Sequence, residues 1–175
     1  MKTKIKENLP FLAAAFLIPL FLMAAVHACI GVWPFGERSI LVLDLNGQYV
    51  YYFEALKNKL FSGGSLFYTW SRALGGEFMG IFAYYVASPF ALIPALFPDG
   101  FMTEGLMTMV LLKVGLSGAT MAFYLDRTAK GDRIKSVIIA TMYAMSSYAV
   151  VQAHNTMWID ALIYLPLLTY ALEAL

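Results

Sequence analysis

The sequence predicts an all-α protein, a polytopic bundle of membrane helices. Its 175 residues are 61% hydrophobic and only 13% charged, whereas soluble domains are nearer half apolar and a quarter charged. Several uncharged runs reach the length of a bilayer span, and polar stretches separate them. The net charge is +1, so nothing indicates a nucleic-acid partner. We therefore take the lipid bilayer as the first partner.

The first apolar run, residues 9–33, follows three lysines and contains no formal charge. A spanning helix needs about 20 residues, whereas the apolar core of a cleaved signal peptide has about 7–15. The length therefore favours an uncleaved span over a signal peptide, and His27, two positions before Cys29, disfavours a lipoprotein anchored at that cysteine. Cys29 is the only cysteine, so an intrachain disulfide is excluded.

An amphipathic helix is predicted in the polar region that follows. Its apolar residues recur at helical spacing, and its polar residues occupy the other side, so we expect it to lie along the membrane surface. Residues 62–65 and the pair Gly75-Gly76 interrupt the chain after it. The apolar positions are Leu45, Tyr49, Tyr52, Phe53, Leu56 and Leu60, and the polar ones are Glu54, Lys57 and Asn58.

A short basic loop around residues 127–135 sets the predicted topology. The positive-inside rule places it in the cytoplasm with the N-terminus. The first span carries the chain out of the cytoplasm, so an odd number of crossings must bring it back before residue 127. Two apolar runs, 78–98 and 105–125, lie between, so one of them does not cross. Residues 78–98 hold glycine and three prolines, which break helices, so we predict a re-entrant or juxtamembrane element there. A plain span is the alternative, and it would place Asp160 in the cytoplasm.

The predicted architecture is therefore a large outer loop at 34–98 between membrane spans. The chain stops just past an apolar run, so we expect a fragment of a longer polytopic protein. The predicted spans are 9–33, 105–125, 136–152 and 161–175.

Two polar clusters are the candidate site, and under this topology both face the outside. The segment 43–52 carries Asp44, and the segment 154–160 carries Asp160. The two acids would meet over one membrane-embedded groove. Either acid could instead cap a helix, His154 could be solvated, and Trp158 could anchor the interface. The candidate substrate-binding side chains in these clusters are Asn46, Gln48, Tyr49, His154, Asn155 and Trp158.

Two cations complete the candidate site. Lys113 lies in the middle of a predicted span, where a lysine costs about 2.5–3.5 kcal/mol to insert. It should therefore pair with an acid or face a phosphate, and on depth alone Lys113→Met should insert at least as well as the wild type. Arg72 could bind an anionic head group, because its fork suits phosphate, or it could be a solvated surface residue.

Four separated motifs resemble the YfhO family of bacterial membrane proteins, in the order in which that family has them. They are Asp44-Leu-Asn-Gly-Gln-Tyr, the segment from Ser65 to Phe78, Ala83-Tyr-Tyr-Val-Ala-Ser-Pro-Phe, and His154-Asn-Thr-Met-Trp-Ile-Asp. The match covers nearly the whole chain as the N-terminal part of a longer protein. The family is similar to GT-C glycosyltransferases, which implies a GT-C-like bundle with juxtamembrane helices in its first outer loop.

The resemblance implies an enzyme of the bacterial cytoplasmic membrane. It would move a sugar from a polyprenyl-phosphate donor to a cell-wall polymer or glycolipid acceptor such as lipoteichoic acid. Asp44 and Asp160 would be catalytic, with Arg72 and Lys113 at the phosphate. Neither acid belongs to an Asp-x-Asp pair, so no cofactor is certain, and a divalent metal on these two acids stays an alternative. The rival function is a multi-pass transporter or flippase of a lipid-linked or anionic substrate.

Overall fold

The computed structural model describes residues 2–72, 74–129 and 132–175. The chain divides into two compact units, the first made of residues 1–38 and 110–175 and the second of residues 39–109. Helices make up most of the described residues of both units, which confirms the all-α class, and the second unit also holds a two-stranded hairpin. The loop at Lys130 lies outside the described residues.

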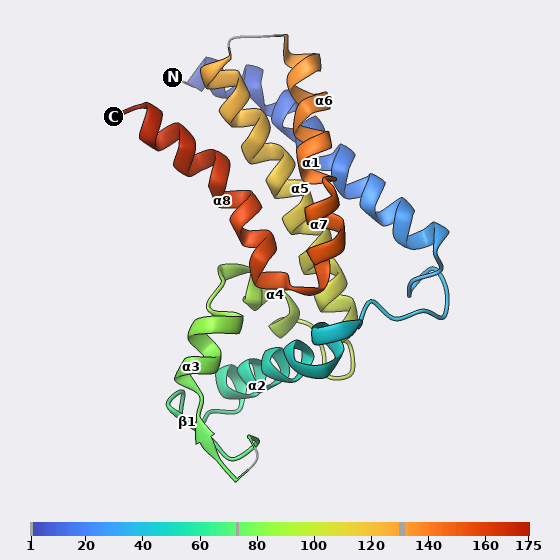
Figure 1. The fold of residues 1–175 in the computed structure, drawn as a ribbon, viewed down its shortest axis with the longest axis vertical. Helices are drawn as coiled ribbons and strands as arrows, with labels where there is room; N and C mark the ends of the chain where they lie inside the picture. The colour runs from blue at the N-terminus through green and yellow to red at the C-terminus, as the bar shows by residue number, and fades with distance from the viewer. Residues whose placement is uncertain (1, 73, 130–131) are drawn as a thin grey trace. The chain divides into compact units, whose positions relative to one another are not determined.

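The first unit is a bundle of long helices (Figure 1). It contains α1 (Lys2–Cys29), most of α5 (Met102–Thr128), α6 (Arg133–Ala144), α7 (Ser147–Val151) and α8 (Thr156–Glu173), with a 3-10 turn, η4 (Gln152–His154), before α8. Helix α1 packs against α6. The contact is built on small residues, since Ala15, Ala122 and Ala140 are fully buried in one cluster with Phe11. Small residues let membrane helices approach closely.

Helices α1 and α5 approach each other at two glycines of α5. A Cβ atom added at Gly118 would overlap the carbonyl oxygen of Ala15 and lie 2.9 Å from the Cγ of Pro19. One added at Gly115 would lie 2.8 Å from the ring of Phe16. Backbone atoms cannot move aside as a flexible side chain can, so these glycines fix the distance between the two helices.

We therefore expect Gly118→Ala to destabilise the bundle by about 1–3 kcal/mol, the usual cost of overpacking. Gly47→Ala is the matched control, because nothing lies within 4 Å of a Cβ placed there. Thermal unfolding of both variants in lipid nanodiscs measures the difference. Equal melting temperatures for the two variants would show that the contact between α1 and α5 is loose.

Within the described part of the chain, three helical segments are long and apolar enough to cross a membrane, namely Leu9–Cys29, Met102–Thr128 and Arg133–His154. The first ends before the predicted boundary at Trp33, because the chain turns into a bridge between Val32 and Arg38. The third is interrupted at residues 145–146, between α6 and α7.

The fourth predicted span, 161–175, falls in α8, which is not among these three segments. Helix α8 includes Asp160 and Glu173 together with two tyrosines, which lower its hydropathy. Its passage through the membrane stays a prediction.

The second unit opens with the predicted amphipathic helix. It begins as a π-helical turn, η1 (Leu45–Tyr49), and continues as α2 (Val50–Phe61). Four of the six predicted apolar positions are buried, at 0–3% exposure: Leu45, Tyr49, Phe53 and Leu56. Leu60 is 46% exposed, because it lies in the last turn, where the chain leaves the helix.

A small hairpin follows, with β1 (Tyr68–Thr69) antiparallel to β2 (Gly76–Glu77). Lys59 of α2 fixes this hairpin by donating to the carbonyl oxygens of Ser65 and Tyr68, the latter at 2.9 Å. The same ammonium lies 4.6 Å from the centre of the Phe78 ring, a cation–π contact. One side chain thus joins α2 to both ends of the hairpin.

Residues 78–98 form a series of short helical pieces, none of them long enough to span a membrane. They are α3 (Met79–Ile81), η2 (Phe82–Val86), η3 (Pro89–Ala91) and α4 (Leu92–Ala95). Pro89 opens one piece and Pro94 sits inside another, as expected of residues that remove a backbone donor. The Lys57 ammonium holds the end of the series at the Phe97 carbonyl, 2.7 Å away, and at Asp99. The position of this segment relative to a bilayer stays a prediction.

Candidate functional site

Asp44 lies at the start of the amphipathic helix with an exposed side chain. Its backbone is already helical, at φ −64° and ψ −26°, and its carboxylate accepts no capping hydrogen bond. The helix-cap alternative for Asp44 is therefore wrong. Asp44 lies at the N-terminal end of the helix dipole. Asn46, two residues on, is exposed as well.

Aromatic rings surround the next turn of this helix. Tyr49 is buried, and its ring lies 5.2 Å from that of Tyr85, edge to face. Tyr85 donates a hydrogen bond from its hydroxyl to Oε1 of Gln48 at 3.2 Å. The Tyr52 ring lies 4.7 Å from the same ring, tilted by 44°. Tyr85, which the sequence analysis did not single out, is thus the residue that joins Gln48, Tyr49 and Tyr52.

The environment of these phenols disfavours their charged form. Burial, followed by the nearby Tyr85, Asp44 and Tyr84, raises the pKa of Tyr49 to about 12. Burial also raises the pKa of Tyr85, to which Tyr52, Tyr84 and Asp44 contribute while Arg72 opposes them. Both Asp44 and Arg72 are therefore close enough to Tyr85 to act on it electrostatically.

The raised pKa of Tyr49 predicts a pH dependence of stability. An ordinary tyrosine has a pKa of about 10, so the folded chain holds this proton more tightly than the unfolded chain. The resulting stabilisation is complete below about pH 10 and is lost as the pH rises to about 12. The melting temperature of Tyr49→Phe should therefore fall less steeply between about pH 10 and pH 12 than that of the wild type. Tyr51→Phe, an exposed tyrosine on the same helix, is the control, and equal slopes for Tyr49→Phe and wild type would contradict the prediction.

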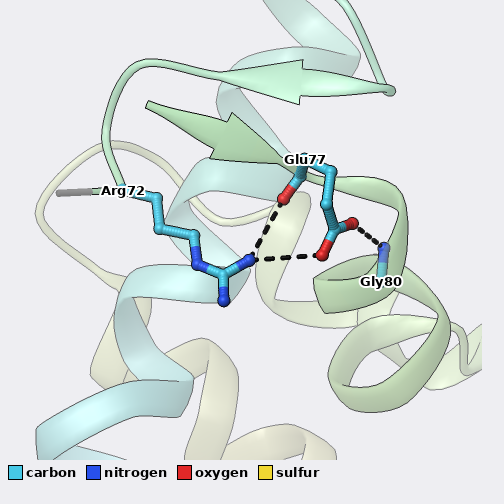
Figure 2. A network of polar contacts seen from close by, with 3 residues as sticks. All are labelled: Arg72, Glu77 and Gly80. Atoms are coloured by element: carbon cyan, nitrogen blue, oxygen red, sulfur yellow. Dashed lines mark hydrogen bonds and ion pairs between the residues drawn. The ribbon is translucent and has the colours of Figure 1, made fainter. Parts of the chain in front are cut away.

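Arg72 forms an ion pair with Glu77 across the hairpin (Figure 2). Its Nη1 lies 3.2 Å from Oε1 of Glu77 and 3.4 Å from the carbonyl oxygen of the same residue. The other carboxylate oxygen of Glu77 accepts a short hydrogen bond from the backbone N–H of Gly80. Both contacts of Arg72 use one nitrogen, so Glu77 does not take up its Nε and Nη2 donors. Both side chains are more than half exposed.

In the first unit, Lys113 and Asp160 form a buried ion pair. The Lys113 ammonium lies 2.7 Å from Oδ1 of Asp160 and donates to the Thr156 carbonyl at 2.8 Å. The lysine side chain is 1% exposed and the aspartate side chain 14%. Lys113 was expected either to pair with an acid or to face a phosphate, and the structure shows the pair with Asp160. Asp160 lies inside α8, four residues after its start, so the helix-cap alternative for Asp160 is wrong.

The remaining candidates form the turn before α8. His154 Nδ1 lies 3.0 Å from the Val151 carbonyl. Asn155 is buried and donates to Gln152 at 2.8 Å, with His154 Nε2 at 3.1 Å. Trp158 is 41% exposed, as an interfacial anchor would be. The hydrogen bonds give Asn155 a structural role in shaping this turn.

The predicted site residues thus fall into two groups. Asp44, Asn46, Gln48, Tyr49 and Arg72 belong to the second unit, and Lys113, Asp160 and the turn at 154–158 belong to the first. The meeting of Asp44 and Asp160 over one groove stays a prediction. Among the described residues, no three or more His, Cys, Asp or Glu side chains gather as a metal site would require. Asp160 already faces an ammonium group, which competes with a metal, so we derive no step through one.

Comparison with known proteins bears on these motifs. The family model described as "Bacterial membrane protein YfhO" matches residues 14–175. This chain belongs to the YfhO family. The match confirms the resemblance seen in the sequence and includes both acid motifs. Searches of curated proteins and of solved structures returned no match.

In this YfhO-family chain, the sequence analysis missed two polar residues near the site, Glu77 and Tyr85. Glu77 is the partner of Arg72, and Tyr85 holds Gln48. The five-residue spacing from Arg72 to Glu77 carries no helical or strand signal, since a hairpin turn brings them together. Tyr85 belongs to the Ala83–Phe90 motif, which was a signal for it in the sequence. Its partner Gln48 lies on another element, so the sequence could not show their contact.

Proposed function

We propose that the protein is a membrane glycosyltransferase with Asp44 as its general base. The observation that carries the proposal is the exposed Asp44 carboxylate, which caps no helix and lies at the start of a surface helix in a YfhO-family chain. A carboxylate without a structural partner is available to accept a proton. Its neighbours Gln48 and Tyr85 are linked by a hydrogen bond, which supports a preorganised site.

The reaction we propose is the transfer of a sugar from polyprenyl phosphate to an acceptor hydroxyl. Asp44 takes the hydroxyl proton as the oxygen forms a bond to the anomeric carbon. The bond between that carbon and the phosphate oxygen breaks, and polyprenyl phosphate leaves with the electron pair. Arg72 is the cation assigned to the phosphate, because cationic donors stabilise developing negative charge and its Nε and Nη2 are not used by Glu77.

The acceptor in this proposal is a cell-envelope polymer or glycolipid such as lipoteichoic acid, outside the cytoplasmic membrane. Lys113 is no longer assigned to the phosphate, since its ammonium is 1% exposed and faces Asp160. In this proposal Asp160 has a structural role within the first unit, as the partner of Lys113. The assay is sugar transfer from a polyprenyl-phosphate donor by membranes that contain the protein, with and without Asp44.

A transporter or flippase is the second candidate, and the Lys113–Asp160 pair is the observation that favours it. Ionisable groups within candidate spans often mark substrate or proton pathways. A transporter would tolerate Asp44→Asn and would lose transport when both Lys113 and Asp160 are neutralised. The glycosyltransferase predicts the opposite result for Asp44→Asn, so this one variant separates the two functions.

The proposal requires the second unit to lie outside the membrane. In a Cys29→Ser background, cysteines at Ser65 and at His154 should react with an impermeant thiol reagent added from outside. A cysteine at Ala129, an exposed position in the basic loop, should react only after the membrane is opened. Labelling of intact cells at Ala129 would contradict the orientation and the site built on it.

A further inference from the structure

The second unit contains a cavity to which only Arg72, of the residues assigned a role above, contributes. Its volume is about 410 Å³, within the range of about 300–1,000 Å³ typical of small-molecule sites. It lies between α2, the hairpin and α3, all within residues 39–109. The residues that matter for its chemistry are Tyr51, Tyr52, Glu54, Asn58, Thr69 and Arg72.

The lining combines aromatic rings with hydrogen-bonding groups. Tyr51 and Tyr52 contribute aromatic rings, while Glu54 and Asn58 contribute carboxylate and amide groups from the next two turns of the same helix. Phe78 and Ile81, both buried, add apolar side chains to the lining. A pyranose ring presents apolar C–H faces above and below and hydroxyls around its edge. Stacking tyrosines and edge-directed amide and carboxylate groups match both features.

The walls of the cavity are held in place before any ligand arrives. Lys59 ties the hairpin to α2 through two carbonyl oxygens and lies over the Phe78 ring. Glu77 holds Arg72 from one side and the Gly80 N–H from the other (Figure 2). Preorganised walls reduce the ordering cost of binding.

The cavity is also close to the proposed base. Tyr52 lines the cavity and its ring contacts that of Tyr85, which in turn donates a hydrogen bond to Gln48, one turn after Asp44. Tyr51 follows Asp44 by seven residues, or about 10 Å along a helix. Arg72, assigned to the phosphate, is part of the lining.

We propose that this cavity binds one pyranose ring, stacked on Tyr51 and hydrogen-bonded by Glu54 and Asn58. The inference rests on the proposed function, because it names the sugar subsite of that reaction. The ring could belong to the donor head group or to the acceptor glycan. Arg72 distinguishes them, since only the donor ring carries a phosphate at its anomeric carbon.

The test is ligand binding, measured apart from transfer. The protein in lipid nanodiscs is titrated with methyl glucoside, methyl galactoside, methyl N-acetylglucosaminide and glucose 1-phosphate, with saturation-transfer NMR as the readout. Tyr51→Ala should weaken the binding of the preferred probe about tenfold, as the loss of a main aromatic anchor does. Tyr51→Phe should keep most of it. Tyr84→Ala is the matched control, because Tyr84 is 62% exposed and Tyr51 60%, and Tyr84 does not line the cavity.

A second variant, at Arg72, shows whether the bound ring belongs to the donor or to the acceptor. If the donor ring binds here, Arg72→Gln weakens the binding of glucose 1-phosphate and leaves the binding of the methyl glycosides unchanged. If the acceptor sits here, Arg72→Gln has equal effects on both kinds of probe. Absence of binding by all four probes, or equal affinity in Tyr51→Ala and Tyr84→Ala, would overturn the inference. Either result leaves Asp44-dependent transfer intact, so it does not decide the proposed function.

Discussion

Asp44→Asn is expected to lower the rate of sugar transfer by about a hundred- to ten-thousand-fold, the usual cost of losing a general base. An amide cannot take the acceptor proton, although it has nearly the size of the carboxylate. Folding should barely change, because the Asp44 side chain is exposed and makes no capping hydrogen bond. The only expected stability term is the charge–dipole interaction at the helix start, worth about 0.3–1 kcal/mol.

The measurement scores transfer and thermal stability separately for Asp44→Asn and Asp44→Ala. Both should be folded and nearly inactive, since neither side chain is a base. Asn46→Ala, a neighbouring exposed position, is the control for nonspecific effects of changing this turn, and it should retain much more transfer activity. Near-normal transfer by Asp44→Asn would remove the base from the mechanism and favour the transporter.

Breaking the Lys113–Asp160 pair is the second change with a large expected effect. Lys113→Met leaves the Asp160 carboxylate in a nearly closed environment without its cation, 2.7 Å from where the ammonium was. Removing one partner of a buried pair costs about 3–5 kcal/mol. The pairing thus reverses the expectation from depth alone, in which losing the lysine only eases insertion.

The double variant Lys113→Met/Asp160→Asn should recover most of that loss, because no unpaired charge remains. The free energy of unfolding in mixed micelles is measured for both variants and for the wild type. Asp99→Asn is the control, since it removes the ion pair with Lys57 through an aspartate that is 97% exposed, and exposed pairs contribute little. If Lys113→Met were no less stable than Asp99→Asn, the pair would not hold α5 to α8.

Local patterns in the sequence predicted the helices of this chain well. The amphipathic helix was found because its buried positions recur with the period of one helix face, which is a property of the segment alone. The proline-rich run at 78–98 was correctly expected to break, for the same local reason. The burial of Lys113 was expected from its depth in an apolar run.

Tertiary contacts set the limits of that prediction. The sequence indicated that Lys113 needed a partner or a phosphate, but the choice of Asp160 depends on how α5 meets α8. The cavity needs three elements brought together by Lys59 and Glu77, residues whose spacing gives no periodic signal. The helix-cap interpretation of Asp44 failed because the backbone is already helical at that residue.

The glycine contact between α1 and α5 has a consequence for how the bundle is completed. Pro19 has no N–H, so it cannot donate to the Ala15 carbonyl four residues earlier, as any other residue would. In hydrocarbon, a carbonyl without a donor costs several kcal/mol. Gly118 lies against this same oxygen, where its Cα–H can serve as a weak donor worth about 0.5–1 kcal/mol. The backbone of α1 at Ala15 is therefore completed by a residue of α5, so the two helices depend on each other for a polar contact as well as for close packing.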